Sequence, residues 1–431
     1  MASAIAALLR QSPLFLAVWL LTLSLAYSYA ISDIGYALVH GGLQSSEVTL
    51  LGRDFVNVYT AGQLVLEGNL AQIYDVAWYQ QYQEVSLPGD LAGHNYSYPP
   101  VSFLYAWAFA LLPYGHSYLA WIGLTGAAFA LAARPYLKEV GLPAVLVLLL
   151  PASIANIWAG HYGFLVAALW LFGWRLLGTR PRLGGILLGC LLIKPHMALL
   201  LPLVLAWRGS WAAFRAAACT VCALILVSGT IFGWELWSSY VTDTLLFQAS
   251  LLGRTGVFYL LLMPSVVPSL SLAGVPKAAS WIAQIVIAVL AIGALLKWMP
   301  RDSGRAGLAT AVATVLVVPY SFNYDLTVVG VLSLLLFRTA SPERVAHRAL
   351  AAVALLLPLL LPYAGAMGLP FGPVILALLL GQALSQSDGA SVSAGTDNER
   401  SRAVRRNEAA LLHRTGAPSA TASLPPAGTS G

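Results

Sequence analysis

Long runs of apolar residues recur along nearly the whole chain, and they constrain the fold more than any other feature. Of the 431 residues, 59% are hydrophobic and only 9% are Asp, Glu, Lys or Arg. A helix needs about 20 apolar residues to cross the hydrocarbon core of a bilayer. The runs are continuous rather than alternating with polar residues, which excludes an outer-membrane β-barrel. The sequence therefore predicts an all-α polytopic membrane protein with about twelve transmembrane helices.

Arginine and lysine residues gather at the ends of the apolar runs, which is typical of the positive-inside rule. Arg10 precedes an apolar run at residues 14–37 that is too long for a signal-peptide core, so we expect an uncleaved first span. If Arg10 is cytoplasmic, the polar loop at residues 39–98 lies outside, as does a second loop at 233–279.

The chain is predicted to divide into a transmembrane domain, residues 1–385, and a tail, residues 386–431. The tail is rich in Ser, Ala, Gly and Arg and has few large apolar residues, which predicts a disordered cytoplasmic segment. If every apolar run crossed the membrane, the number of crossings would be odd, and the tail would lie on the outer side. We therefore expect one of the two runs between residues 101 and 133 not to cross the membrane fully.

Several function classes are not supported by the sequence. The net charge of +6 comes without a basic stripe interleaved with exposed aromatic residues, so nucleic acid is not an expected partner. Neither a glycine-rich phosphate loop nor GxGxxG is present, so a nucleotide is not an expected partner. Cys190, Cys219 and Cys222 all fall in apolar segments and are interpreted as packing residues. No metal or cofactor is predicted, because no cluster has the spacing of metal ligands.

The first outer loop carries two predicted interfacial helices. Residues 54–66 form a short amphipathic pattern that we expect to lie on the membrane surface, ended by Gly68. A second, aromatic-rich helix is expected near residues 78–84. The loop closes at Tyr98-Pro99-Pro100, and paired prolines suit the start of a helix.

Polar clusters interrupt the apolar runs on the face opposite the positive charges. They comprise Arg53-Asp54, residues 160–162, residues 194–196 and residues 321–325. Lys194-Pro195 lies between two short apolar arms, which indicates a broken or re-entrant helix pair. A lysine at membrane depth is costly enough, at about 2.5 kcal/mol or more, to indicate a function. We expect these clusters to form one site.

The order of these motifs resembles glycosyltransferase family 87, the bacterial polyprenol-phosphate-mannose-dependent α-mannosyltransferases of the glycosyltransferase-C class. The resemblance spans residues 14–380. The first-loop aspartate of that family, its catalytic base, corresponds to Asp54, its Tyr-Pro-Pro element to Tyr98-Pro99-Pro100, and its Lys-Pro element to Lys194-Pro195. This sequence departs from the pattern at His161, where the family often has Gln, and in the late motif, which has no histidine here.

The chemistry of a lipid-phosphate sugar donor gives each candidate residue a role. Asp54 is the expected catalytic base for the acceptor hydroxyl, and Asp325 is the alternative base or simply a carboxylate at a helix start. Lys194 is the expected phosphate ligand, or a lysine that snorkels to the interface. Further candidate substrate-binding residues are Arg53, Tyr59, Tyr98, His161, His196, Arg254 and Tyr324.

The resemblance implies an inverting glycosyltransferase in the bacterial inner membrane with its active site on the periplasmic or extracellular side. It would move a hexose, with mannose the expected sugar, from a polyprenyl-phosphate donor to a glycolipid or glycan acceptor. A transporter or flippase of a lipid-linked sugar is the alternative, and it predicts inverted repeats that the sequence lacks. A non-catalytic assembly subunit is a third alternative.

Overall fold

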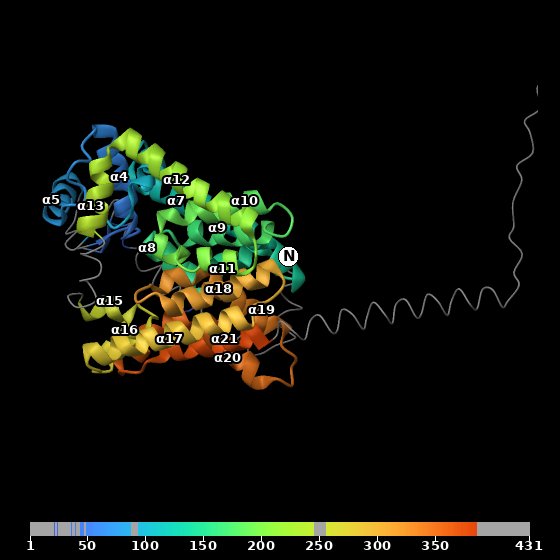
Figure 1. The fold of residues 1–431 in the computed structure, drawn as a ribbon. Helices are drawn as coiled ribbons and strands as arrows, with labels where there is room; N and C mark the ends of the chain where they lie inside the picture. Colours follow the sequence, from blue (N-terminus) through green and yellow to red (C-terminus); the bar gives the residue numbers. More distant parts are fainter. Residues whose placement is uncertain are drawn as a thin grey trace, which may run out of the picture. The chain divides into compact units, whose positions relative to one another are not determined.

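The structure is a computed structural model that describes residues 49–87, 94–244 and 256–385, with residues 44–46 and a few isolated earlier positions. The described chain is helical apart from a short antiparallel ladder of β1 (Gln44–Ser46) and β2 (Thr49–Leu50). This confirms the predicted all-α class (Figure 1). The first predicted span and the predicted tail lie outside the described residues.

Among the described residues, four helices are long and apolar enough to cross a membrane. They are α7 (Tyr114–Glu139), α12 (Trp211–Phe232), α17 (Lys277–Lys297) and α20 (Val345–Ala366). Shorter apolar helical segments cover residues 100–110, 163–176, 181–193, 195–207, 303–317 and 371–385. The membrane class of the protein is therefore supported, whereas the number of crossings stays a prediction.

The remaining elements are short helices that connect or interrupt the longer ones. In chain order they are α4 (Phe55–Glu67), α5 (Val76–Ser86), η2 (Pro100–Ser102), α6 (Phe103–Ala110), η3 (Ala144–Leu149), α8 (Pro151–Ala159), α9 (Gly163–Leu176), α10 (Pro181–Gly189), η4 (Cys190–Ile193), η5 (Pro195–Ala198), α11 (Leu201–Trp207), α13 (Trp234–Ser239), η6 (Tyr240–Thr244), α15 (Val257–Leu261), α16 (Val266–Leu272), α18 (Ser303–Val317), η7 (Asn323–Leu326), α19 (Thr327–Thr339) and α21 (Phe371–Ser385).

The two apolar runs between residues 101 and 133 differ in length. Helix α6 has 8 residues and α7 has 26. At 1.5 Å per residue, α6 reaches about 12 Å and α7 about 39 Å, against a hydrocarbon core of about 30 Å. Only α7 is long enough to cross by itself, which agrees with a single full crossing in this part of the chain.

The basic ends of several helices lie at one end of the molecule. Arg175 near the end of α9 pairs with Glu139 at the end of α7 at 3.7 Å. Arg208, after α11, donates to the carbonyl oxygens of Pro300 at 2.7 Å and Arg301 at 2.9 Å, which follow α17. These contacts place positive ends from different parts of the chain together, as the positive-inside rule requires.

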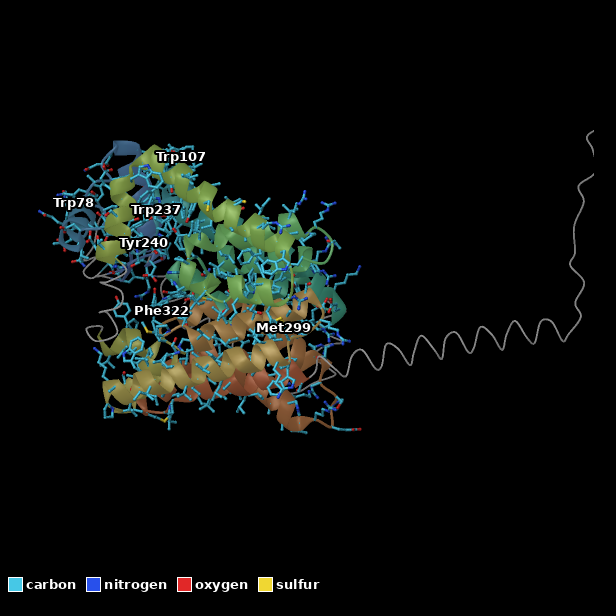
Figure 2. All side chains as sticks on the ribbon, viewed as in Figure 1. Trp78, Trp107, Trp237, Tyr240, Met299 and Phe322 are labelled. Carbon is cyan, nitrogen blue, oxygen red and sulfur yellow. The ribbon has the colours of Figure 1, made fainter. Side chains whose placement is uncertain are left out.

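Aromatic side chains mark the opposite end. Figure 2 shows Trp78, Trp237 and Tyr240 at the end that holds α5 and α13, and Met299 at the other. The Tyr240 ring lies 5.8 Å from that of Tyr74 in the first loop and 6.0 Å from that of Trp237. The first loop and the start of the second therefore pack against each other.

Helix α4 is packed into the protein core, whereas the sequence predicted an amphipathic helix on the membrane surface. Its bounds agree with the prediction, and Gly68 ends it in the left-handed conformation. However, its first turns are buried all round, including Phe55, Asn57 and Tyr59. Gly62 allows this packing because a Cβ there would meet Ala110 Cβ at 2.8 Å and the backbone of α6. A helix without a side chain at its contact point can pack closely, so α4 is part of the core.

Candidate active site

A strained turn places Asp54 at the start of α4. Gly52 has φ +78° and Arg53 has φ +36°, and Arg53 is the one non-glycine residue with positive φ in the part of the chain that the structure describes. This conformation costs an ordinary residue about 1–2 kcal/mol, so the surroundings must hold it. Asp54 occupies the N-cap position, but its side chain makes no capping hydrogen bond. The carboxylate is therefore not used to build the helix.

Aromatic residues of α7 hold this turn in place. Tyr114 donates its hydroxyl hydrogen bond to the carbonyl oxygen of Leu51 at 2.9 Å. One turn further along α7, Tyr118 lies against Gly52, where a Cβ would meet its ring at 2.5 Å. The ring of Phe55 packs edge-on against both tyrosines, with centroids 5.5 and 5.7 Å away. The turn that carries Asp54 is therefore fastened to a membrane-spanning helix.

The break between α8 and α9 packs against the same turn. Helix α8 ends at Gly160 with φ +64°, and Trp121 of α7 donates to the Gly160 carbonyl at 3.1 Å. A Cβ on Gly160 would lie 2.5 Å from the Gly52 carbonyl oxygen and 2.6 Å from Phe55 Cβ. Only glycine permits this approach. It brings the Asp54 turn and His161 together, although more than a hundred residues separate them in sequence.

The late motif packs on the other side of this break. Gly163 at the start of α9 lies so close that a Cβ would come 2.5 Å from the Tyr324 carbonyl oxygen. Thr327 donates its hydroxyl to the Gly163 carbonyl at 3.1 Å. Asn323 N–H donates to the Leu262 carbonyl at 2.9 Å, which links the motif to the second outer loop. Residues 323–327 are thereby fixed beside His161.

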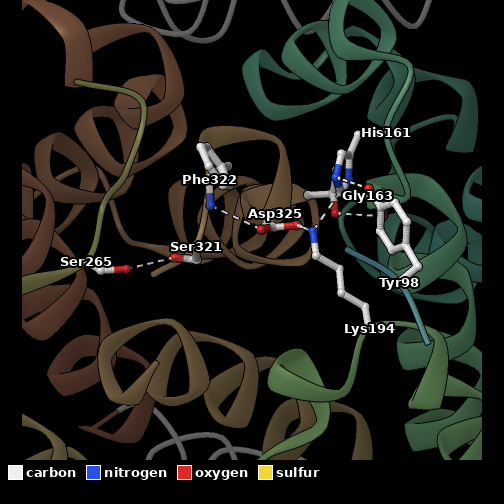
Figure 3. A network of polar contacts seen from close by, with 9 residues as sticks. Tyr98, His161, Gly163, Lys194, Ser265, Ser321, Phe322 and Asp325 are labelled. Carbon is white, nitrogen blue, oxygen red and sulfur yellow. Dashed lines mark hydrogen bonds and ion pairs between the residues drawn. The ribbon is translucent and has the colours of Figure 1, made fainter. Parts of the chain in front are cut away.

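A buried ion pair joins two of the predicted breaks. Lys194 Nζ forms an ion pair and hydrogen bond with Asp325 Oδ1, and their side chains are only 5% and 1% exposed (Figure 3). The other carboxylate oxygen of Asp325 accepts from Phe322 N–H at 3.1 Å. Lys194 lies between η4 and η5, so the proline break in this segment delivers its side chain.

His161 and Tyr98 extend this pair into a chain of hydrogen bonds. Lys194 Nζ lies 3.4 Å from His161 Nδ1, and His161 Nε2 lies 2.7 Å from the Tyr98 hydroxyl (Figure 3). The His161 ring stacks on Tyr324 with centroids 4.0 Å apart. The structure thus brings together the predicted residues Tyr98, His161, Lys194, Tyr324 and Asp325.

Asp54 lies within electrostatic reach of this cluster. Burial raises the pKa of its carboxyl above the ordinary value, and the charges of His94, Lys194 and Arg53 oppose the shift, whereas Asp325 adds to it. His94 Nε2 is 3.7 Å from Asp54 Oδ1, and the Asp54 side chain is 32% exposed. A carboxylate that is partly accessible and has a raised pKa suits a general base.

The other predicted residues contact aromatic rings. The guanidinium of Arg53 stacks on Trp158 at 3.8 Å. Tyr59 packs against Tyr114, with ring centroids 5.1 Å apart. The His196 ring lies 4.9 Å from that of Tyr320. Arg254 lies outside the described residues.

The sequence-based analysis did not single out His94, Trp158 or Phe322. His94 lies just before the Tyr-Pro-Pro element. It follows Asp54 by 40 positions, so no local sequence pattern links His94 to Asp54. Trp158 is an apolar residue next to a polar break, and Phe322 lies inside the cluster at residues 321–325 without an assigned role. Across residues 49–87, 94–244 and 256–385, no group of three His, Cys, Asp or Glu side chains is arranged to hold a metal ion.

A sequence model of glycosyltransferase family 87 matches residues 96–321, which is more than half of the chain. The chain belongs to glycosyltransferase family 87. The matched region includes Tyr98, His161 and Lys194, whereas Asp54 precedes it and Asp325 follows it. No curated protein and no solved structure matches the chain. Membership of family 87 identifies the protein as a glycosyltransferase, an enzyme with a sugar donor and an acceptor, rather than a transporter.

Proposed function

We propose that this family 87 enzyme is an inverting hexosyltransferase that uses a polyprenyl-phosphate sugar, with mannose the expected sugar. The acceptor is a glycolipid or glycan at the outer face of the bacterial inner membrane. One observation carries this proposal: the turn of the partly exposed carboxylate Asp54 packs against Gly160, and the next residue, His161, lies 3.4 Å from Lys194 of the buried ion pair. A base and a cation in one site are what transfer from a phosphate leaving group requires.

Asp54 removes the proton from the acceptor hydroxyl as its oxygen attacks the anomeric carbon. The bond between that carbon and the phosphate oxygen breaks, and the polyprenyl phosphate leaves with the electron pair. Direct attack inverts the anomeric centre, so a β-linked donor gives an α-linked product. The raised pKa of Asp54 supports this role, because a base is more effective when its pKa approaches the working pH.

Asp325 is the weaker candidate for the base. One of its oxygens is paired with Lys194, and the other accepts from Phe322 N–H. Its side chain is 1% exposed, against 32% for Asp54. Both oxygens of Asp325 are therefore already engaged by donors of the protein. We therefore assign the base to Asp54 and the stabilisation of the leaving phosphate to Lys194.

The arrangement of charges supports the proposed side of the membrane. Arg175 in the last turn of α9 pairs with the end of α7, and Arg208 after α11 contacts the segment that follows α17. Asp54 precedes α4, which packs with the aromatic start of α7 at the other end of that helix. By the positive-inside rule, the site then faces the periplasm or the exterior, where a lipid-linked donor presents its sugar at headgroup level.

The test is a transfer assay with purified full-length protein. Radiolabelled polyprenyl-phosphate mannose, glucose and arabinose are each offered with a panel of glycolipid acceptors. We expect mannose transfer by the wild type and none by Asp54→Asn, with both proteins folded. Asp75→Asn is the matched control, because Asp75 is an exposed N-cap carboxylate of α5 and should leave activity unchanged. Full activity of Asp54→Asn would remove Asp54 from its role, and no transfer from any polyprenyl-phosphate sugar would overturn the proposed donor class.

A further inference from the structure

The hydrogen bonds around His161 determine which of its ring nitrogens carries the proton. The Lys194 ammonium has only donors, so His161 Nδ1, at 3.4 Å, must accept. A neutral imidazole that accepts at Nδ1 carries its hydrogen at Nε2. That nitrogen lies 2.7 Å from the Tyr98 hydroxyl and therefore donates to its oxygen. The charge of Lys194 fixes the tautomer of His161 in this way.

The direction of this chain leaves the Tyr98 hydroxyl hydrogen free to donate. Its oxygen accepts from His161, so its own O–H must point to another acceptor. The described part of the chain offers no such acceptor within hydrogen-bond distance of this hydroxyl. The hydroxyl lies 2.7 Å from His161 Nε2, and the other nitrogen of that ring lies 3.4 Å from Lys194 Nζ, so one imidazole separates it from the ion pair. Beside the ion pair there is therefore one hydroxyl donor without an acceptor among the described residues.

The surrounding contacts hold this donor in position. Tyr74 donates its hydroxyl to the Tyr98 carbonyl at 2.8 Å, which fixes the backbone. The Tyr98 ring packs against Tyr162, with centroids 4.3 Å apart. The His161 ring is stacked on Tyr324, so its plane and the direction of its N–H are also fixed. Preorganised donors of this kind stabilise charge that develops during a reaction.

We propose that the Tyr98 O–H donates a hydrogen bond to the phosphate of the lipid-linked donor, and that Lys194 sets the direction of this bond through His161. This inference rests on the proposed function and adds a specific ligand for the phosphate. Lys194 then acts twice on the leaving group, once by its charge and once through the hydrogen-bond chain. His161 is a positioning residue, because it acts through Tyr98.

Substitutions at Tyr98 and His161 separate this role from simple packing. Tyr98→Phe keeps the ring and removes the donor. His161→Leu removes both the acceptor and the donor of the imidazole. His161→Gln restores both, because a side-chain amide accepts at its oxygen and donates at its nitrogen. The chain thus offers a loss variant and a matched rescue variant at the same position.

The measurement is binding of farnesyl phosphate to the purified full-length protein, with farnesol as the uncharged control. We expect Tyr98→Phe to weaken farnesyl phosphate binding about ten- to hundredfold, as for a lost hydrogen bond to a charged group. His161→Leu should weaken it in the same direction, and His161→Gln should stay within about threefold of the wild type. Farnesol binding should not change in any variant. Thermal unfolding confirms that each variant is folded, and if Tyr98→Phe does not fold, the His161 pair decides.

Three outcomes would contradict the inference. Wild-type affinity of Tyr98→Phe for farnesyl phosphate would mean that Tyr98 does not bind the phosphate, even if sugar transfer is slowed, since it would then contact the sugar. Equal weakening by His161→Gln and His161→Leu would remove the hydrogen-bond chain. Both results leave the proposed glycosyl transfer intact. If the wild type binds farnesyl phosphate no better than farnesol, the proposed donor class fails together with this inference.

Discussion

Replacement of one partner of the buried Lys194–Asp325 pair should destabilise the protein in a pH-dependent way. Lys194→Met leaves the Asp325 carboxylate unpaired in a site where it is only 1% exposed. That carboxylate can avoid an unpaired buried charge by taking up a proton. Asp325→Asn creates the opposite case, an unpaired lysine, and it keeps an oxygen acceptor for Phe322 N–H.

The size of the effect follows from the cost of neutralising the remaining group. A pH of 7 is about three units above the pKa of a free aspartate and about three and a half units below the pKa of a free lysine. Each unit adds about 1.4 kcal/mol to the free energy of neutralising the group. Lys194→Met should therefore cost about 4 kcal/mol of unfolding free energy and Asp325→Asn about 5 kcal/mol. Both values agree with about 3–5 kcal/mol for breaking a buried pair.

The two single variants should respond to pH in opposite directions. Lys194→Met binds an extra proton on folding, so its stability should rise by about 1.4 kcal/mol for each unit that the pH falls from 7. Asp325→Asn releases a proton on folding, so its stability should rise as the pH increases. The double variant has no buried charge and should lie within about 1–2 kcal/mol of the wild type. It should nevertheless be inactive, because the phosphate ligand is gone.

The assay is unfolding of the purified variants in a denaturing detergent titration, followed by tryptophan fluorescence at pH 5, 7 and 9. Lys138→Met at the exposed basic end of α7 is the control and should behave as the wild type. The reasoning would be refuted by a Lys194→Met protein as stable as the wild type. Parallel pH dependence of the two single variants, or a double variant less stable than either, would refute it equally.

Three further predictions concern the turn that carries Asp54 and the helix α4 that follows it. Because burial raises the pKa of Asp54, the acid limb of the pH–rate profile for transfer should lie at a pH above the ordinary carboxyl range. His94→Gln removes a charge that opposes this shift, so it should move the acid limb to still higher pH. Gly160→Ala should lower activity at least about tenfold, since a Cβ would meet the Gly52 carbonyl at 2.5 Å. Gly68→Ala has similar φ strain but no contact within 4 Å, so only its thermal stability should fall, by about 1 kcal/mol. Gly62→Val should cost about 1–3 kcal/mol in an unfolding titration because it overpacks α4 against α6.

Much of the fold could be predicted because each prediction depended on local patterns. The length of the apolar runs predicted a membrane protein. The prolines at positions 99–100 and 195 predicted the starts of the helical turns η2 and η5. Gly68 marked the end of α4 within one residue. The burial of α4 was not predicted, because an amphipathic pattern does not show whether a helix meets lipid or another helix. The close approach at Gly62 decided that, and it depends on α6.

The sequence by itself determined which polar residues interrupt the apolar runs, since a charge or a glycine-proline break in such a run is costly and therefore conspicuous. It did not determine which of these residues pair. Lys194 is 131 positions from Asp325 and 33 from His161, and only the packing of α8, α9 and η7 brings them into contact. The direction of the hydrogen-bond chain to Tyr98 likewise follows from contacts between distant segments. The tertiary structure alone decided these pairings, because hydrogen bonds and ion pairs act over a few ångströms in space whatever the separation along the chain.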